Sequence, residues 1–340
     1  MPPLRPTART LATVLNTTRH HSTTSSVSAN ELSHFSSLAS SWWDPMGPSR
    51  VLHLMNPLRH DFIATCLADA PPERDQGPGP GPGQGRGRGR GRGLKYLDIG
   101  CGGGIFAESM ARTIPSSTNP TSSTGSSIAT AASVTAIDPS PTLIQIAQSH
   151  ARTDPKIDAH LRSGLFRYQN RTLEDLVDES QTAPTPASGT TGDGYDVVTL
   201  FEVLEHVDPD PGHNAPQNFL TNCLRLVRPG GWLVGSTIAR TFPSWIVNQV
   251  IAEAPWPVGV VPRGTHEWAK FVNPREVRAW AEEGLMRGRD GAARRAAAEE
   301  ALSGMRWACE GVVYFPGLGW KIVKGSEDWG NYFWAVRKGV

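Results

Sequence analysis

The stretch "KYLDIGCGGGIFAES", from Lys95 to Ser109, decides the fold. A short apolar run precedes four glycines within the five residues 100–104, and a segment of helical character follows them. Glycine carries no Cβ atom, so a turn rich in it lets a ligand approach the backbone closely. In open α/β sheets, ligands bind beyond the carboxyl ends of the strands. The stretch therefore predicts a strand, a ligand-binding turn and a helix.

Predicted strands and helices alternate along the rest of the chain. "SVTAIDPS" (133–140) reads as a strand, and Pro141 opens a helix after it. Strands alternating with helices predict a Rossmann-like α/β sheet, largely parallel, with helices on both faces. "NYFWAVRK" (331–338) follows "GVVYF" (311–315) without a helix between them, which predicts an antiparallel last strand. The pattern predicts seven strands in total.

The composition of the chain argues against several classes of protein. The chain has 340 residues and a formal net charge of +1, so it lacks the basic footprint of a nucleic-acid-binding protein. Four cysteines without a CxxC pair argue against a disulfide framework or a structural zinc site. Low-complexity sequence predicts disordered insertions, which lie near residues 73–93, 115–133, 181–194 and 287–304.

The first thirty residues differ from the rest. They contain Arg5, Arg9 and Arg19, many Ser and Thr, and no acid before Glu31. This composition predicts a mitochondrial transit peptide at 1–30, with an ordinary disordered tail as the alternative. Residues 31–340 would then form one catalytic domain, beginning with a leader segment at 31–70. No apolar run reaches the roughly 18 residues of a transmembrane helix.

The acids beside the glycine turn indicate the ligand. The dinucleotide fingerprint G-x-G-x-x-G is absent, because no glycine occupies its last position. A carboxylate at Asp98 would repel a pyrophosphate and favour a cationic sulfonium nucleoside, although we expect this side chain to point elsewhere. Asp138 ends the second strand, where an acid can accept hydrogen bonds from both ribose hydroxyls. The alternative role for Asp138 is a helix N-cap.

"LDIGCGGG" followed by "AIDPS" resembles the class I S-adenosylmethionine-dependent methyltransferases. "FSSLASSWWDPMGPSRVLHLMNPLRHDFI" (35–63), "YDVVTLFEVLEHV" and "PRGTHEWAKFVNPREV" resemble one family within that class, the ubiquinone-biosynthesis O-methyltransferases. The resemblance implies methylation of phenolic hydroxyls in polyprenylated dihydroxybenzoate and demethylubiquinol. It also implies a mitochondrial enzyme, peripheral on the matrix side of the inner membrane, within a ubiquinone-biosynthesis complex.

The resemblance extends to individual residues. Arg59 of "NPLR", Gly100 of "LDIG", Asp138 of "AIDPS" and Phe201 before "EVLEH" fall where the family contacts the cofactor. Family members often have Met where this chain has Phe201, so this position is a departure. We expect its ring to pack against the adenine or the sulfonium.

A candidate metal site lies in "FEVLEHV", which places Glu202, Glu205 and His206 at i, i+3 and i+4. If the segment is helical, the three side chains share one face. Mg²⁺, Mn²⁺ or Zn²⁺ held there would favour the phenolate form of a catechol, and the resemblance implies such a metal too. The alternative is that the acids are solvated and His206 acts as a general base.

The segment from Ser244 to Trp268 lies where the class places a cover over the substrate. Its Trp and aliphatic residues, beside Arg263 and Lys270, suit a membrane interface, whereas the alternative is packing on the core. His266 is a single loop histidine and indicates little on its own. Two other functions stay open: methylation of nitrogen or carbon, and a non-catalytic subunit that keeps the fold.

Overall fold

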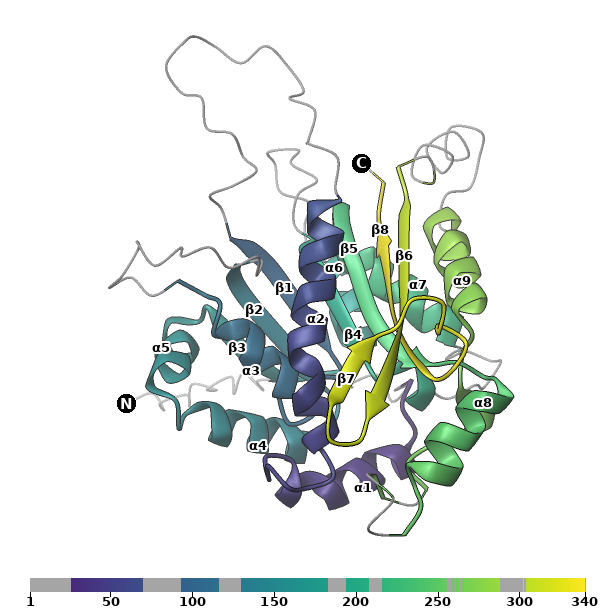
Figure 1. Ribbon diagram of the computed structural model, residues 1–340. Helices are drawn as coiled ribbons and strands as arrows, with labels where there is room; N and C mark the ends of the chain where they lie inside the picture. The colour runs from purple at the N-terminus through teal and green to yellow at the C-terminus, as the bar shows by residue number, and fades with distance from the viewer. Residues whose placement is uncertain are drawn as a thin grey trace, which may run out of the picture.

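The computed structural model describes residues 26–69, 93–115, 130–182, 194–207, 216–255, 259, 261–262, 264–287, 302 and 304–339. They form one mixed sheet with helices on both faces (Figure 1). The strands are β1 Leu94–Ile99, β2 Ala131–Asp138, β3 Phe166–Asn170, β4 Tyr195–Phe201, β5 Val227–Ile238, β6 Arg306–Phe315, β7 Gly319–Ile322 and β8 Asn331–Arg337. The α-helices are α1 Ala29–Leu38, α2 Arg50–Ala68, α3 Ile105–Ala111, α4 Pro141–Ala151, α5 Pro155–Ser163, α6 Leu173–Thr182, α7 Pro216–Leu226, α8 Phe242–Trp245 and α9 Pro274–Met286.

The sheet order is β3-β2-β1-β4-β5-β8-β6-β7. The first five strands in this order are parallel, and β8 is antiparallel to β5, as the sequence predicted for the last strand. The described sheet has eight strands where the sequence predicted seven. The additional strand is β7, which folds back on β6 and pairs Trp320 with Tyr314. It is only four residues long and half exposed, so it carries no clear alternation of apolar and polar residues.

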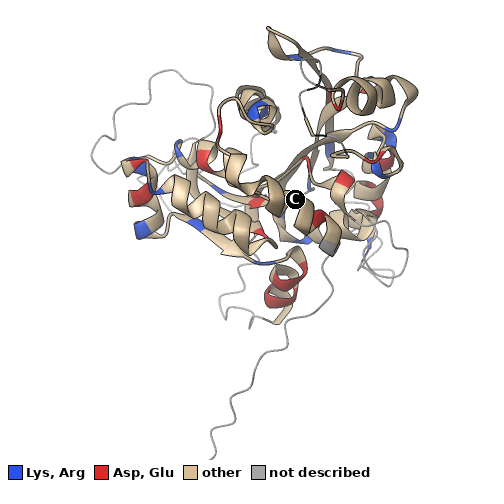
Figure 2. Cartoon of the chain, turned by 90° about the horizontal axis from the view of Figure 1, so that it is seen from below, with Lys and Arg blue, Asp and Glu red and all other residues tan. Residues whose placement is uncertain are grey.

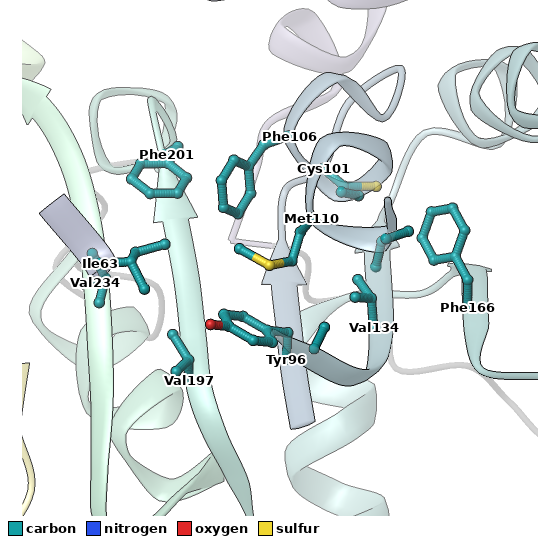
Figure 3. Packing of buried hydrophobic residues seen from close by; sticks show 14 of the residues in the cluster. Ile63, Tyr96, Cys101, Phe106, Met110, Val134, Phe166, Val197, Phe201 and Val234 are labelled. Atoms are coloured by element: carbon teal, nitrogen blue, oxygen red, sulfur yellow. The ribbon is translucent and has the colours of Figure 1, made fainter. Parts of the chain in front are cut away.

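Two apolar clusters cover the two faces of the sheet. On one face, α2, α3, α4 and α5 pack on the strands, and Figure 3 shows Met110 of α3 with Tyr96 of β1 and Phe201 of β4 in this cluster. On the other face, α6, α7 and α9 contribute the second cluster. Burial on both faces explains why the central strands read as nearly continuous apolar runs. The layers leave the carboxyl ends of β1, β2 and β4 free to build a site.

Local capping agrees with the sequence. Pro141 stands at the start of α4, and the Ser140 hydroxyl accepts a hydrogen bond from the Leu143 amide. Helix α7 ends at Leu226, and "VRPGG" already belongs to β5, because Val227 pairs with Tyr195.

The leader is part of the fold. Val27 forms a β-bridge with Val207, the Ser26 hydroxyl donates to Glu174, and Ser28 caps α1. Residues 26–28 therefore contact the domain, and they lie within the stretch 1–30 that the sequence predicts as a transit peptide. Residues 1–25 lie outside the described part, as do the four expected insertions apart from their flanks. Figure 2 shows Lys and Arg interspersed with Asp and Glu on the outer helices in that view.

Glu31 holds α1 against the body of the protein. Its two carboxylate oxygens contact Lys270 Nζ at 3.0 Å and His206 Nδ1 at 3.2 Å. Burial raises the pKa of Glu31, but the hydrogen bond and charge of His206, and then those of Lys270, lower it to about 2. The ordinary value is 4.5, so the folded state favours the ionised carboxylate. Its stabilising contribution is complete above about pH 4.5 and is lost as the pH falls toward 2.

We predict that Glu31→Gln lowers the free energy of unfolding by about 1–3 kcal/mol at pH 7, because charged hydrogen bonds are lost. Urea titration at fixed pH values measures this difference, which should shrink as the pH falls below 4.5. Glu267→Gln is the matched control, since Glu267 also pairs with Lys270 but is 63% exposed. An equal loss in both variants, or a loss independent of pH, would contradict the assignment.

Candidate active site

The glycine turn after β1 is formed by close contacts that only glycine allows. Gly102 has φ +53°, and a Cβ atom there would lie 2.6 Å from the Trp42 ring. Gly104 has φ +90° and starts α3 against Tyr168. The leader covers the turn, because the Trp43 indole also donates to the Gly103 carbonyl at 2.9 Å. The turn is therefore shaped by backbone conformation on one side and by two tryptophans on the other.

Asp138 lies at the end of β2 and accepts two backbone hydrogen bonds. Its oxygens are 2.9 Å from the Gly102 amide and 2.8 Å from the Ser140 amide. Burial raises the pKa of Asp138 to about 6, and these two bonds oppose the rise. The cap of α4 is Ser140, so Asp138 does not take the N-cap position. A carboxylate has about four acceptor sites, which leaves capacity for ligand hydroxyls.

Asp98 departs from the expectation that it points elsewhere. It lines the same cavity as Asp138, and its carboxylate accepts a hydrogen bond from Thr199 at 2.7 Å. Burial raises the pKa of Asp98 to about 7, against the effects of Thr199 and Arg59. The direction of its side chain could not be read from spacing, because β1 is apolar on both faces and gives no alternation.

Arg59 extends from α2 over the ring of Phe201, with its guanidinium carbon 4.7 Å from the ring centroid. It is 3% exposed, and its Nε has no hydrogen-bond partner among the described residues. Its Nη1 donates to Asn56 at 3.2 Å. A buried guanidinium with an unused donor suits an anionic ligand group. Phe201 also packs edge-on against Phe106 at 4.6 Å, which holds its ring in the cavity wall.

These residues line one cavity of about 510 Å³, bounded by the leader, the strand ends and the β6–β7 hairpin. The four residues that the family resemblance assigned to the cofactor all line it: Arg59, Gly100, Asp138 and Phe201. The cavity also has four carboxylates, from Asp98, Asp138, Glu202 and Glu205, against one guanidinium. This excess of negative charge favours a cationic ligand.

The expected helix through "FEVLEHV" is wrong. Glu202 has φ +55°, and one 3₁₀ turn, η2 (Leu204–His206), follows it. The three side chains therefore do not share a helix face. Glu202 instead accepts hydrogen bonds from Ser236 at 2.5 Å and from Asn331 at 3.2 Å. Glu205 accepts one from Thr237 at 2.7 Å.

The metal ligands expected from the sequence are not gathered in this structure. Among the described residues, no group of three or more His, Cys, Asp or Glu side chains is placed to hold a metal ion. Glu202, Glu205 and His206 all line the cavity, so their chemistry fits a divalent cation while their positions do not. We derive no chemical step through a metal.

His206 and Glu205 have opposite electrostatic surroundings. Burial lowers the pKa of His206, but its hydrogen bond to Glu31 and the charges of Glu205, Glu31 and Glu202 together raise it. Burial, followed by the charge of Glu202, raises the pKa of Glu205 to about 7. The cavity wall thus holds an imidazole that favours its protonated form beside a carboxyl that resists ionisation.

The other half of the cavity is apolar. Val247 and Ile251 of the π-helical turn η3 (Ile246–Ile251) line it together with Val312, Trp320 and Trp329. Next to this half, α8 and η3 present exposed apolar side chains: Phe242, Trp245, Val247, Val250 and Ile251. The sequence predicted that this segment covers the substrate, and its cavity-lining residues are consistent with that position.

Sequence reasoning missed several residues of the site. Trp42 and Glu31 gave no motif signal, because each acts through a contact distant along the chain. Asp98 was noticed beside the glycine turn, but its side chain was expected to point elsewhere. Glu253 was also missed, although its contact with His266 Nδ1 at 3.1 Å spans only a short loop.

The sequence of this chain is similar to those of known methyltransferases. Residues 53–284 match the family model described as "Methyltransferase domain". The mitochondrial ubiquinone biosynthesis O-methyltransferase of Candida albicans is 32% identical over 92% of this chain and 86% of its own length. Its counterpart in Schizosaccharomyces pombe is 36% identical over 77% of this chain and 72% of its own length. The ubiquinone biosynthesis O-methyltransferase of Pasteurella multocida is 34% identical over 76% and 83%.

The three relatives cover most of both chains, and the range matched by the family model includes the glycine turn and Asp138. The fold has the parallel core and antiparallel C-terminal strands of the class I methyltransferases. The chain therefore belongs to the ubiquinone biosynthesis O-methyltransferases, a family of S-adenosylmethionine-dependent enzymes.

Proposed function

We propose that this protein transfers the methyl group of S-adenosylmethionine to phenolic hydroxyls of polyprenylated dihydroxybenzoate and demethylubiquinol. The observation that carries the proposal is one cavity with an acidic, glycine-lined half and an apolar half. The first half suits a sulfonium nucleoside, and the second suits a prenylated ring. Transfer is an in-line displacement, so holding oxygen and methyl carbon in contact supplies much of the rate.

Within the acidic half, each residue has a distinct role in the proposal. Asp138 accepts the ribose hydroxyls, and the Gly100 backbone allows the methionyl part to lie close. Arg59 pairs with the carboxylate of the cofactor through its unused Nε donor. Phe201 packs on the sulfonium side of the cofactor, where an aromatic face favours a cation.

We predict that Asp138→Ala weakens S-adenosylmethionine binding by roughly 10- to 150-fold, as one lost charge-assisted hydrogen bond costs about 1.5–3 kcal/mol. Isothermal titration calorimetry measures the affinity. Mass spectrometry of the product from a short-prenyl dihydroxybenzoate then measures methyl transfer. Asp178→Ala, an exposed acid on α6, is the control and should bind and turn over like the parent. Unchanged affinity in a folded Asp138 variant would overturn the cofactor site.

His206, which also lines the cavity, is the catalytic group in this proposal. Its raised pKa favours an imidazolium, which would hold one oxygen of a catechol by donating a hydrogen bond. The proposal also retains a divalent cation, Mg²⁺ or a similar ion, on Glu202, Glu205 and His206; His206 would then be a neutral ligand, and the imidazolium belongs to the metal-free state. The support is the repulsion between Glu202 and Glu205, which a cation would relieve. Binding would require both carboxylates to leave Ser236 and Thr237.

We predict that EDTA abolishes turnover and that Mg²⁺, Mn²⁺ or Zn²⁺ restores it. Binding is measured separately by electron paramagnetic resonance of Mn²⁺ titrated into the parent and into Glu202→Gln. The variant should lose the bound Mn²⁺ signal while keeping its affinity for S-adenosylmethionine. Full activity after chelation, with no bound Mn²⁺ in the parent, would remove the metal and leave His206 acting directly on the substrate.

The same proposal places the enzyme on the matrix side of the mitochondrial inner membrane, as a peripheral protein. Its polyprenylated substrate lies in lipid, and the exposed side chains of Phe242 (69%) and Trp245 (40%) suit an interface. No described helix is long and apolar enough to cross a bilayer.

Mitochondrial relatives and the acid-free first residues support import into mitochondria. The proposal puts the cleavage before Ser26, because Ser26 already packs in the domain. Membership of a ubiquinone-biosynthesis complex is the remaining part of the proposal.

We predict that Phe242→Ser together with Trp245→Ser reduces binding to phospholipid vesicles at least several-fold without changing cofactor affinity. Co-sedimentation with neutral and anionic vesicles measures this. Leu165→Ser is the control, because Leu165 is equally exposed (40%) but precedes β3 at the far edge of the sheet. Equal co-sedimentation of parent and double variant would refute the membrane contact.

A further inference from the structure

Glu253 and His266 form a buried pair that the roles assigned above do not use. Glu253 is 9% exposed, and one of its oxygens accepts the Gly264 amide at 2.7 Å. The other oxygen faces both the backbone amide and the Nδ1 atom of His266, at 2.8 and 3.1 Å. Both carboxylate oxygens are therefore directed at the loop that carries His266.

His266 is fixed in orientation. Gln249 donates to its carbonyl at 2.6 Å, and its ring meets Phe271 edge-on at 6.0 Å. Hydrogen bonding of Nδ1 to a carboxylate places the proton on Nδ1 and leaves Nε2 as an acceptor. The ring lines the cavity, whereas Glu253 does not, and Nε2 has no hydrogen bond to the described residues.

The surroundings of His266 disfavour its charged form. Burial lowers the pKa of His266, and the charge of His206 lowers it further, while Glu253 and Glu202 raise it without offsetting the burial. At neutral pH, His266 therefore favours its neutral form, and its Nε2 is able to accept a proton.

We infer that His266, positioned by Glu253, is the proton acceptor for the hydroxyl that becomes methylated. This inference rests on the proposed function. The hydroxyl proton passes to Nε2 as the oxygen attacks the methyl carbon. The O–CH₃ bond forms, the S–CH₃ bond breaks, and its electron pair stays on sulfur to give S-adenosylhomocysteine. The imidazolium then releases the proton to solvent.

The test compares two substrates of different acidity. A general base contributes about 10²- to 10⁴-fold, so His266→Gln should lower kcat by that range on a short-prenyl catechol. A nitro-substituted catechol is already ionised at neutral pH and needs no base. His266→Gln should therefore lose less than tenfold on that substrate, with unchanged affinity for S-adenosylmethionine. An equal loss on both substrates would overturn the inference.

Two further variants separate chemistry from loop structure. Gln249→Ala removes a bond to the His266 carbonyl but leaves the imidazole, so its kcat should stay within a few-fold of the parent. Glu253→Gln removes the negative charge next to Nδ1, and the acidic limb of the kcat/KM profile should move to lower pH. The charged groups that His266 also senses, Glu202 and His206, are unchanged in this variant. A loss in Gln249→Ala as large as in His266→Gln would assign the effect to the loop.

Failure of the inference is distinguishable from failure of the proposed function. If the parent methylates neither catechol, the substrate assignment falls. If the parent methylates both and His266→Gln is as active as the parent on the unsubstituted catechol, only the role of His266 falls.

Discussion

The carboxylate of Asp138 ties together the two turns that make the site. It accepts the amide of Gly102 in the turn after β1 and the amide of Ser140 at the start of α4. These bonds offset part of the cost of burying a charge, which is still visible in its raised pKa. Because one side chain closes both turns, the ends of β1 and β2 cannot move independently. Any ligand between them meets a preformed surface.

The negative charge of the cavity is a second constraint on the structure. Four carboxylates around Arg59 make the cavity costly to bury, and burial accordingly raises the pKa values of Asp98, Asp138 and Glu205. Such a cluster persists only where function compensates for the loss of stability. A bound sulfonium would restore the charge balance, so cofactor binding and stability of the domain are coupled.

Sequence alone predicted the fold well, because its signals were local. The apolar run before the glycines, Pro141 at the start of α4 and the absence of a helix before β8 each depend on neighbouring residues. Arg59, Gly100, Asp138 and Phe201 were placed by motif resemblance, and they do meet in one cavity.

The prediction failed where geometry depends on tertiary context. Spacing suggested a helix through Glu202, Glu205 and His206. Glu202 adopts positive φ instead, where Ser236 donates to its carboxylate and Asn331 does so from the neighbouring strand. The direction of the Asp98 side chain and the pairing of Glu253 with His266 likewise depend on the three-dimensional structure. Neither follows from the spacing of residues along the chain or from composition.

The leader has a consequence for the order in which the chain becomes functional. Trp42 and Glu31 stand near the start of the chain, yet Glu31 contacts Lys270, and the indole of Trp320 donates to the Val51 carbonyl at 2.8 Å. The cavity wall therefore joins the first and the last described segments. During synthesis, a chain that lacks β7 has no complete cavity wall. Folding of the glycine turn can therefore precede completion of the cavity that surrounds it.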